Sequence, residues 1–330
     1  MDTSDEDTSL AKRILRDLRI IFDRETNLLE FDIVPVEDKT LNKSPVIFED
    51  HRLGLESWSI KYLYTYCYHE FLKTRSHRAR SDSATINELT RTLLLINPEL
   101  KTAWNCRKQL VIDKYLTIQD ELTFCQLLMR RRSKNMENFT HRQWLIQMMV
   151  KTQGHPDTNF INNELELCLE AARRYQSNYY AWTYRRWVVQ TYAYNLNACL
   201  HEMATSKAWI ERHISDYSGF GYRQYIIVTI GSLYLDTQDK LLAYEDYESI
   251  LVNEMDLIND LLRIHCNRES LYLHRRFVVS QLLSIDGSKD KELYDREKDF
   301  IIQYLQIGRD KLLIERLIRW YQRFLNWNFT

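Results

Sequence analysis

A short motif that recurs along the chain constrains its fold more than any other feature. Each copy has an aromatic residue, two further residues, an arginine and usually a second aromatic two positions on. The five copies are Trp104–Arg107, Phe139–Arg142, Trp182–Arg185, Phe220–Arg223 and Tyr272–Arg275. Successive motif arginines are 35, 43, 38 and 52 residues apart. A period of this length suits one helical hairpin per repeat, with longer connections in the longer intervals.

The composition also favours long helices joined by short connections. The 330 residues include only 7 Gly and 4 Pro, the residues that sheet proteins need for their many turns. Pro35 and Pro45 each bias the preceding residue away from helix, so we expect an extended segment at Asp32–Pro45. The predicted fold is all-α, a right-handed α-α superhelix in which helical hairpins stack as a solenoid similar to TPR arrays.

These patterns divide the chain into four parts. Residues 1–9 are acidic and polar, which predicts a disordered leader. N-terminal helices and the extended segment occupy 10–84, and C-terminal capping helices occupy 287–330. The repeats fill 85–285, with copies at about 85–118, 120–153, 163–198, 201–235 and 253–286.

The second helix of each repeat has a recognisable start. Asn135, Asn178 and Asp216 each stand seven residues before a motif arginine. Asn and Asp accept hydrogen bonds from the free N–H groups of a first helical turn. We therefore predict that these three residues are N-caps, and that the repeat unit is a helix, a short capped turn and a second helix.

The motif residues are predicted to be structural anchors. In the third repeat, Trp182 would act as a wedge against the preceding helix, and Arg185 would pair with a carboxylate or carbonyl in the adjacent repeat. The other motif aromatics and arginines would have the same roles. His141 and His274 directly precede motif arginines, and we expect them to form hydrogen bonds between repeats and not to bind a metal.

Several classes of function are disfavoured. The net charge is −1 and the sequence pI is about 6.8, so no overall basic field attracts nucleic acid, which argues against an RNA-binding repeat protein. The nine histidines form no HExxH or other paired metal spacing, and the sequence has no glycine-rich phosphate loop. We assign no catalytic residue and expect the isolated chain to be inactive and to hold no metal.

The sequence is also typical of a cytoplasmic protein. Its six cysteines form no CxxC pair, and Met1–Leu10 has no signal-peptide pattern, which suits reduced thiols. No apolar run approaches the roughly 20 residues that a membrane span needs.

Two stretches carry a family resemblance. They are Asn-Tyr-Tyr-Ala-Trp-Thr-Tyr-Arg-Arg-Trp at 178–187 and Phe-Thr-His-Arg-Gln-Trp at 139–144. Both resemble the repeat of protein prenyltransferase α subunits, and the resemblance covers roughly 85–285. It implies a crescent of helical hairpins that wraps around a β subunit. In that family the β subunit holds the zinc ion and most of the isoprenoid pocket, so this chain would carry no cofactor of its own.

The resemblance also implies two residues that bind the isoprenoid diphosphate. In the family these are a Lys directly before the Asn of one repeat and a Tyr directly after the Asn of the next. Lys134 and Tyr179 occupy those positions here. An ammonium and a hydroxyl group at that place stabilise the charge that grows on a departing diphosphate. Met136 stands where familiar α subunits have Tyr, which puts substrate preference in doubt.

Two functions from different classes remain open. The first is an α-like subunit of a heterodimeric protein geranylgeranyltransferase, with the β subunit of Rab geranylgeranyltransferase as its partner. Its complex would use geranylgeranyl diphosphate and acceptor proteins with a C-terminal cysteine. The second is a non-enzymatic helical-repeat adaptor that binds protein partners.

Overall fold

The computed structural model describes residues 5–36, 44–76, 82–235, 240–285, 290–307 and 310–329. These residues form two compact units, Met1–Arg185 and Arg186–Thr330, and the boundary between them falls within a helix. No helix of the described residues is both long and apolar enough to cross a membrane.

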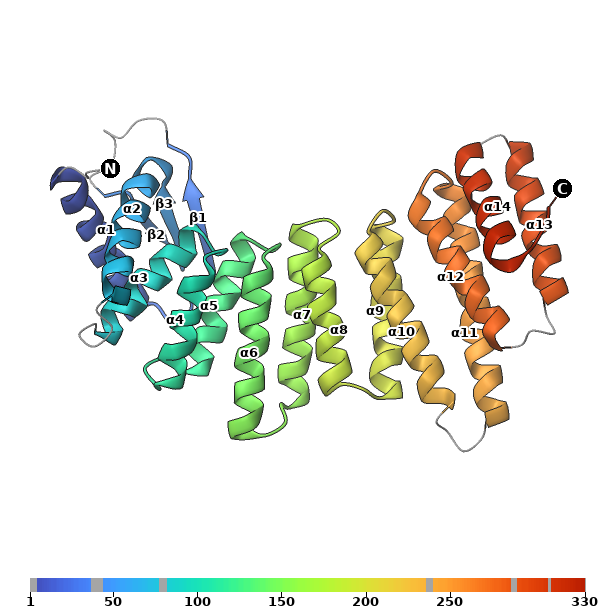
Figure 1. The fold of residues 1–330 in the computed structure, drawn as a ribbon, viewed down its shortest axis with the longest axis horizontal. Coiled ribbons are helices and arrows are strands. Elements are labelled where there is room, and N and C mark those ends of the chain that lie inside the picture. Colours follow the sequence, from blue (N-terminus) through green and yellow to red (C-terminus); the bar gives the residue numbers. More distant parts are fainter. Residues whose placement is uncertain are drawn as a thin grey trace. The chain divides into compact units, whose positions relative to one another are not determined.

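Both units are built from helices that pack in chain order (Figure 1). The first contains α1 (Asp5–Arg24), α2 (Ile60–Ser76), α3 (Ser83–Ile96), α4 (Lys101–Ile112), α5 (Ile118–Arg131), α6 (Met136–Gln153), α7 (Thr158–Arg174) and the start of α8 (Tyr179–Tyr192). The second contains the rest of α8 and α9 (Leu196–Arg212), α10 (Tyr217–Leu235), α11 (Lys240–Ile264), α12 (Glu269–Ile285), α13 (Asp290–Ile307) and α14 (Lys311–Leu325). Consecutive helices pair as hairpins, for example α5 with α6 and α11 with α12. The predicted all-α class with one helical hairpin per repeat is therefore confirmed.

The predicted caps do begin their helices. The side chains of Asn135, Asn178 and Asp216 each accept a hydrogen bond from the backbone N–H three residues on, at 2.8, 3.3 and 3.0 Å. Each cap satisfies one of the N–H groups that a helix start leaves without an intrahelical partner. The capped turns therefore fix where α6, α8 and α10 begin.

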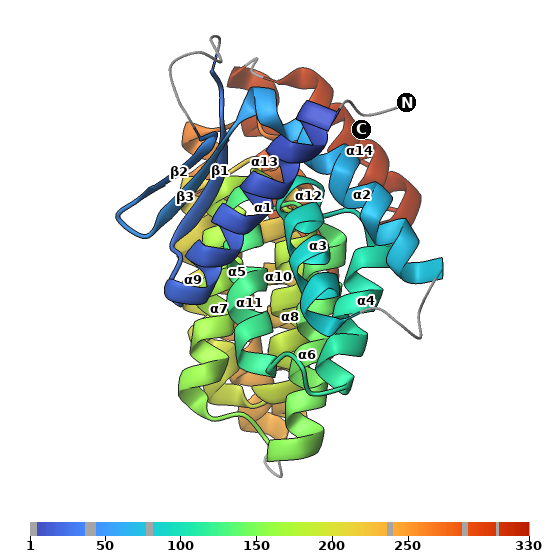
Figure 2. The same cartoon turned by 90° about the vertical axis from the view of Figure 1, so that its left-hand side faces the viewer.

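A small sheet in the first unit was not predicted. Its strands are β1 (Glu30–Val34), β2 (Val46–Glu49) and β3 (Arg52–Glu56). The central strand β3 pairs with β1 in parallel and with β2 antiparallel. The sheet lies beside α1, and β1 contacts α5 (Figure 2). The extended segment predicted at Asp32–Pro45 covers most of β1, while residues 37–43 lie outside the described residues. Such short strands leave little periodic signal in a sequence.

Part of the acidic stretch that was predicted to be disordered is helical. We expected residues 1–9 to be disordered, but α1 begins at Asp5, so the prediction is wrong from Asp5 to Ser9, while residues 1–4 lie outside the described residues. The acidic residues that suggested disorder occupy the first turn of α1. Carboxylates are stabilised there by the positive end of the helix dipole.

Candidate functional site

The motif arginines lie buried at the joints between hairpins. The Nε of Arg142, on α6, donates to Glu164 of α7 at 2.8 Å, and its Nη1 donates to the carbonyl of Leu122 on α5 at 2.7 Å. Arg142 thus links the first helix of its own hairpin to the first helix of the next. The same kind of ion pair joins Arg107 to Glu121, Arg223 to Glu254 and Arg275 to Glu297, and Arg185 donates to the carbonyl of Leu165. The glutamate partners lie in the next hairpin, as predicted. The carbonyl partners of Arg142 and Arg185 lie on the first helix of the same hairpin, and not in an adjacent repeat as predicted.

Four buried glutamates also contact the second helix of their own hairpin. The contact is with the residue directly before the motif arginine, 20 positions further along the chain. The pairs are Glu121–His141 at 3.0 Å, Glu164–Tyr184 at 2.8 Å, Glu254–His274 at 2.7 Å, and Glu202–Tyr222. His141 therefore contacts a carboxylate within one hairpin, and not between repeats as we predicted. His274 does both: it contacts Glu254 within its hairpin, and its Nδ1 lies 3.2 Å from Nε2 of Gln224 on α10, which is the predicted hydrogen bond between repeats.

These contacts keep the buried carboxylates ionised. Burial alone would raise the pKa of Glu121, but the charge of Arg107 and the hydrogen bonds from Arg107 and His141 outweigh it and lower the pKa to about 2. Burial also lowers the pKa of His141, because the charged imidazolium is disfavoured there. At neutral pH the joint therefore consists of a guanidinium, a carboxylate and a neutral imidazole.

The motif aromatics fill the space beside these joints. Trp104, Phe139, Trp182, Phe220 and Tyr272 are all buried. The ring centre of Trp104 lies 4.6 Å from that of His141, and that of Phe139 lies 5.3 Å from that of Tyr184. Phe220 packs likewise on His274, at 5.1 Å. Trp104, Phe139 and Phe220 thus contact the second helix of the following hairpin. The predicted wedge of Trp182 against the preceding helix stays a prediction.

Two capped turns of the first unit are tied together. Asn178 is fully buried, and its Nδ2 donates to the carbonyl of Ser133 at 2.8 Å and to that of Ala171 at 3.2 Å. Ser133 belongs to the turn between α5 and α6, and Asn178 to the turn between α7 and α8. The starts of α6 and α8 therefore lie at the same end of neighbouring hairpins.

Lys134 directly follows Ser133 and is exposed at this end. Its Nζ lies 3.4 Å from the hydroxyl oxygen of Tyr175 and 4.5 Å from the centre of that ring. The ammonium group is thus held over an aromatic face. No ion pair joins Lys134 to a carboxylate of the described residues, so an incoming anion meets a charge that is not already neutralised.

Two of the arginines before Lys134, unlike Lys134 itself, contact carbonyls or carboxylates of other elements. Arg130 donates to the carbonyl of Leu29 at 2.7 Å and contacts Glu170 at 3.2 Å. Arg131 donates to the carbonyl of Leu95 at 2.7 Å. These arginines tie α5 to the N-terminal segment, to α3 and to α7, so Lys134 is not simply one member of a solvated basic cluster.

Tyr179 is the first residue of α8 and directly follows the cap Asn178. It is 63% exposed, and its hydroxyl forms no hydrogen bond to the residues that the structure describes. Its ring meets that of Tyr180 edge-on, with centres 5.9 Å apart. Together with Lys134 it presents one cation and one neutral donor beside two helix N-termini, an arrangement that suits a phosphate-bearing ligand.

The position after the first cap carries no donor. Met136 is exposed, and Glu137 forms an ion pair with Lys101 at 3.3 Å. Among the described residues, no group of three or more His, Cys, Asp or Glu could hold a metal ion.

Comparison with known proteins places these repeats in a family. The family model for the protein prenyltransferase alpha subunit repeat matches residues 118–149, 161–192 and 199–230, which fall on the hairpins α5–α6, α7–α8 and α9–α10. The human protein prenyltransferase alpha subunit repeat-containing protein 1 is 29% identical over 90% of this chain and 87% of its own length. The 1-A form from Xenopus laevis is 32% identical over 83% of this chain and 73% of its own length. The chain belongs to the protein prenyltransferase alpha subunit repeat-containing family.

A subunit of a known transferase also resembles this chain over part of its length. The geranylgeranyl transferase type-2 subunit alpha of Candida albicans is 32% identical over 116 residues, which is 31% of this chain and 31% of that protein. The resemblance inferred from the motifs at 139–144 and 178–187 is therefore confirmed at the level of the family.

The sequence reasoning missed the buried glutamates of this repeat. A signal for them exists, because four of them precede their His or Tyr partner by the same 20 residues. It is weak in any single repeat, since a lone Glu on an amphipathic helix usually faces solvent.

Proposed function

We propose that the chain is the α-like subunit of a heterodimeric protein prenyltransferase and the scaffold for a zinc-bearing β subunit. Its family membership and its similarity to a geranylgeranyl transferase type-2 subunit alpha support this role. That relative favours geranylgeranyl as the transferred group and the β subunit of Rab geranylgeranyltransferase as the partner. The complex would act in the cytoplasm on proteins with a C-terminal cysteine.

The observation that carries the proposal is the placement of Lys134 and Tyr179. Both are exposed at one end of neighbouring hairpins, and the hydrogen bond from Asn178 to the Ser133 carbonyl fixes the two turns against each other. Because the two turns are fixed against each other, the backbone positions that carry the two donors need no reordering when a ligand arrives, which lowers the entropy cost of binding.

The chemistry of these two residues fits the departure of a diphosphate. Breaking the bond between an allylic carbon and diphosphate moves negative charge onto the phosphate oxygens. The Lys134 ammonium and the Tyr179 hydroxyl would stabilise that charge more in the transition state than in the ground state. When bound in the partner, zinc supplies the activation of the acceptor thiol, so this chain contributes positioning and electrostatics.

Co-expression with individual β subunits tests the proposal. We expect a stable heterodimer with the β subunit of Rab geranylgeranyltransferase, and transfer from geranylgeranyl diphosphate to a cysteine-ended acceptor only when both chains are present. The β subunit of farnesyltransferase is the matched control. If no β subunit co-purifies, the adaptor function replaces the transferase.

A further inference from the structure

The residue directly after each motif arginine forms a second pattern along the chain. The five residues are Lys108, Gln143, Arg186, Gln224 and Arg276. All five have long side chains that can donate hydrogen bonds, and none is acidic. Three of them lie in the second unit, on α8, α10 and α12. In that unit α10 packs on α12 and α12 on α14, so the second helices of successive hairpins form one layer.

The two arginines of this pattern lie on aromatic rings of the next second helix. Cζ of Arg186 is 4.3 Å from the ring centre of Tyr225 on α10, and Cζ of Arg276 is 5.7 Å from that of Trp320 on α14. A guanidinium held against a ring keeps its N–H edge available for a carboxylate. Arg186, Gln224 and Arg276 thus form a polar row with one residue from each of three successive hairpins.

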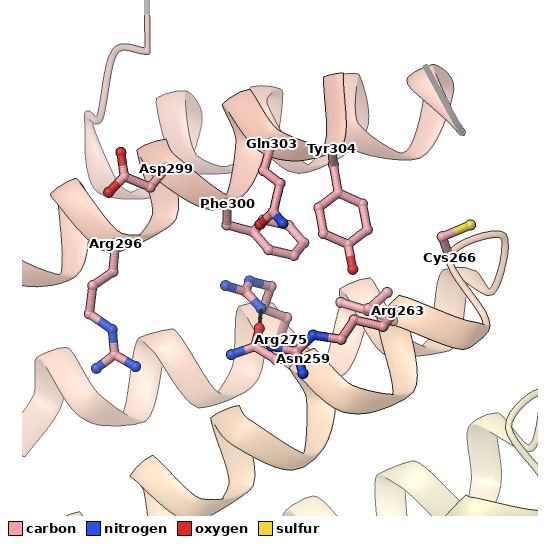
Figure 3. A pocket seen from close by; sticks show the side chains of 10 residues that line it. Asn259, Arg263, Cys266, Arg275, Arg296, Asp299, Phe300, Gln303 and Tyr304 are labelled. Carbon is pink, nitrogen blue, oxygen red and sulfur yellow. Dashed lines mark hydrogen bonds between the residues drawn. The ribbon is translucent and has the colours of Figure 1, made fainter. Parts of the chain in front are cut away.

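The arginines of the polar row have no counter-ion, unlike the motif arginine beside them. Arg275 pairs with Glu297, and its Nη1 donates to Asn259 Oδ1 at 2.6 Å, the contact drawn in Figure 3. The guanidinium groups of Arg186 and Arg276 form no ion pair or hydrogen bond to the described residues, and the Nε of Arg276 is buried without an acceptor. Burial lowers the pKa of Arg276, because the protein supplies too little negative charge around this cation.

Charge is unevenly divided between the two kinds of helix in the second unit. Outside the buried joint pairs, the second helices (α8 from Arg186 on, α10, α12 and α14) carry six basic and two acidic residues. The first helices α9, α11 and α13 carry seven basic and ten acidic residues. One of the two acids on the second helices, Glu269, already pairs with Arg316 at 2.7 Å. The layer of second helices is therefore a positive surface, and the complementary partner surface is acidic.

Gln224 indicates which kind of acidic partner fits. His274 Nε2 donates to the Glu254 carboxylate at 2.7 Å, so in the neutral imidazole Nδ1 accepts from Gln224 Nε2 at 3.2 Å. The Oε1 atom of Gln224 has no donor among the described residues and is left to accept one. A peptide has backbone N–H groups between its acidic side chains, whereas the phosphodiester backbone of a nucleic acid and the phosphates of a membrane surface have none.

We propose that the polar row binds an extended acidic segment of a partner protein. Packed helices lie about 8–10 Å apart, and an extended chain advances about 3.3 Å per residue, so the segment would pass from one hairpin to the next in about three residues. Acidic side chains about six residues apart would then meet Arg186 and Arg276, with a backbone N–H group at Gln224 between them. This inference does not rest on the proposed transferase role, and a heterodimer could fail to form while the segment still binds.

Fluorescence anisotropy with the full-length chain tests the proposal. The probe is a labelled peptide of twelve Gly, Ser and Glu residues that has two pairs of Glu six positions apart. One control peptide has Gln in place of every Glu, and another has its four Glu in a single run. A labelled oligothymidylate of twelve nucleotides and phosphatidylcholine vesicles that contain phosphatidylserine represent the other two classes of anionic partner.

We expect the peptide with spaced Glu pairs to bind most tightly and the Gln peptide not to bind. Arg186→Gln and Arg276→Gln should each weaken binding about tenfold, as expected for the loss of one charge-assisted hydrogen bond. Arg212→Gln, at an exposed position of the first helix α9, should leave binding unchanged. Because Arg186 is exposed, its replacement provides the test even if Arg276→Gln does not fold.

Four outcomes would overturn the proposal. They are the absence of peptide binding, binding that survives Arg186→Gln, equal binding of the peptide with a single run of Glu, and tighter binding of the oligonucleotide or of the vesicles that depends on Arg186. The last outcome would assign the polar row to a nucleic acid or to a membrane surface.

Discussion

At the scale of single residues, the motif arginines are held by partners that must stay ionised. Arg142 sits between Glu164 of the next hairpin and the Leu122 carbonyl of its own, and Glu164 also accepts from the Tyr184 hydroxyl. A buried ion pair adds little net stability relative to well-packed apolar residues, but the loss of one member leaves the other charge uncompensated. The joint therefore specifies which helices meet more than it strengthens the fold.

Arg142→Ala should consequently be severely destabilising. We expect the free energy of unfolding to fall by about 3–5 kcal/mol, because Glu164 would remain as a buried charge without its counter-ion. Arg173→Ala is the matched control, since Arg173 forms an exposed ion pair with Glu166 of the same helix, α7, and it should change stability by less than about 1 kcal/mol. Urea unfolding of the two variants makes the comparison; equal losses would show that burial of the pair is unimportant.

The same joints predict a loss of stability in acid. Burial would raise the pKa of Glu254, but hydrogen bonds and charges from Arg223 and His274 lower it to about 2. A carboxyl group whose pKa is depressed by folding contributes stability above its unfolded pKa. That contribution is lost as the pH falls from about 4.5 toward 2, and is on the order of 3 kcal/mol.

Glu254→Gln should remove this part of the acid sensitivity. The variant will be less stable at neutral pH, but its free energy of unfolding should fall less steeply between about pH 5 and pH 3 than that of the wild type. Glu211→Gln, at an exposed position of α9, should keep the wild-type slope. Urea titrations at a series of pH values measure these slopes, and a parallel decline in all three proteins would refute the assignment.

At the scale of helices and turns, the repeated motif allowed much of the architecture to be predicted. The spacing of Asn178 and Arg185 set the start of α8 because a cap and a helical stripe are both local signals. The partner of each arginine was harder to identify. Glu121 follows its arginine by 14 residues, whereas Glu254 follows by 31, because α10 extends further beyond its arginine than α4 does, and α11 begins further before its glutamate than α5 does.

The candidate site was only partly predictable. Family resemblance assigned Lys134 and Tyr179, but the bond that joins their turns depends on Asn178 reaching Ser133, 45 residues earlier in the chain. No local pattern encodes a contact at that separation. The same limit explains the missed sheet, in which β1 pairs with β3 across more than 20 residues.

Asn178 should therefore do more than cap its helix. Asn178→Ala removes the cap and also both carbonyl contacts of the buried Nδ2 group, and we expect a loss of about 2–4 kcal/mol, the sum expected for a cap and two unsatisfied buried acceptors. Asn195→Ala provides the control, because Asn195 caps α9 from an exposed position, and it should lose about 1 kcal/mol.

The difference between the stability losses of the two variants measures the contribution of the hydrogen bond from Asn178 to the Ser133 carbonyl. Thermal and urea unfolding measure the stability of each, and hydrogen exchange at the start of α8 locates the effect. Comparable losses in the two variants would mean that the Ser133 contact contributes nothing beyond ordinary capping.

At the scale of the whole molecule, the hairpins supply a frame and the proposed chemistry requires a second chain. The described residues include no metal-binding cluster, and the candidate site has only two exposed polar groups, Lys134 and Tyr179. In the proposed complex these two groups would stabilise an anion, and the β subunit would activate the thiol and enclose the isoprenoid. Replacement of Lys134 should therefore lower the activity of the complex and leave the assembly of the complex unchanged.

Lys134→Ala in the heterodimer separates these two properties. We expect unchanged co-purification with the β subunit, because loss of this ammonium group removes one contact among the described residues, that with the exposed Tyr175 side chain. The rate of geranylgeranyl transfer should fall by about 10- to 100-fold, the range for loss of one charged group that stabilises a transition state. Lys151→Ala, at the opposite end of α6, should leave both assembly and rate unchanged. A rate that survives Lys134→Ala would remove Lys134 from the site, and a rate lost equally in both variants would point to a general electrostatic effect of the first unit.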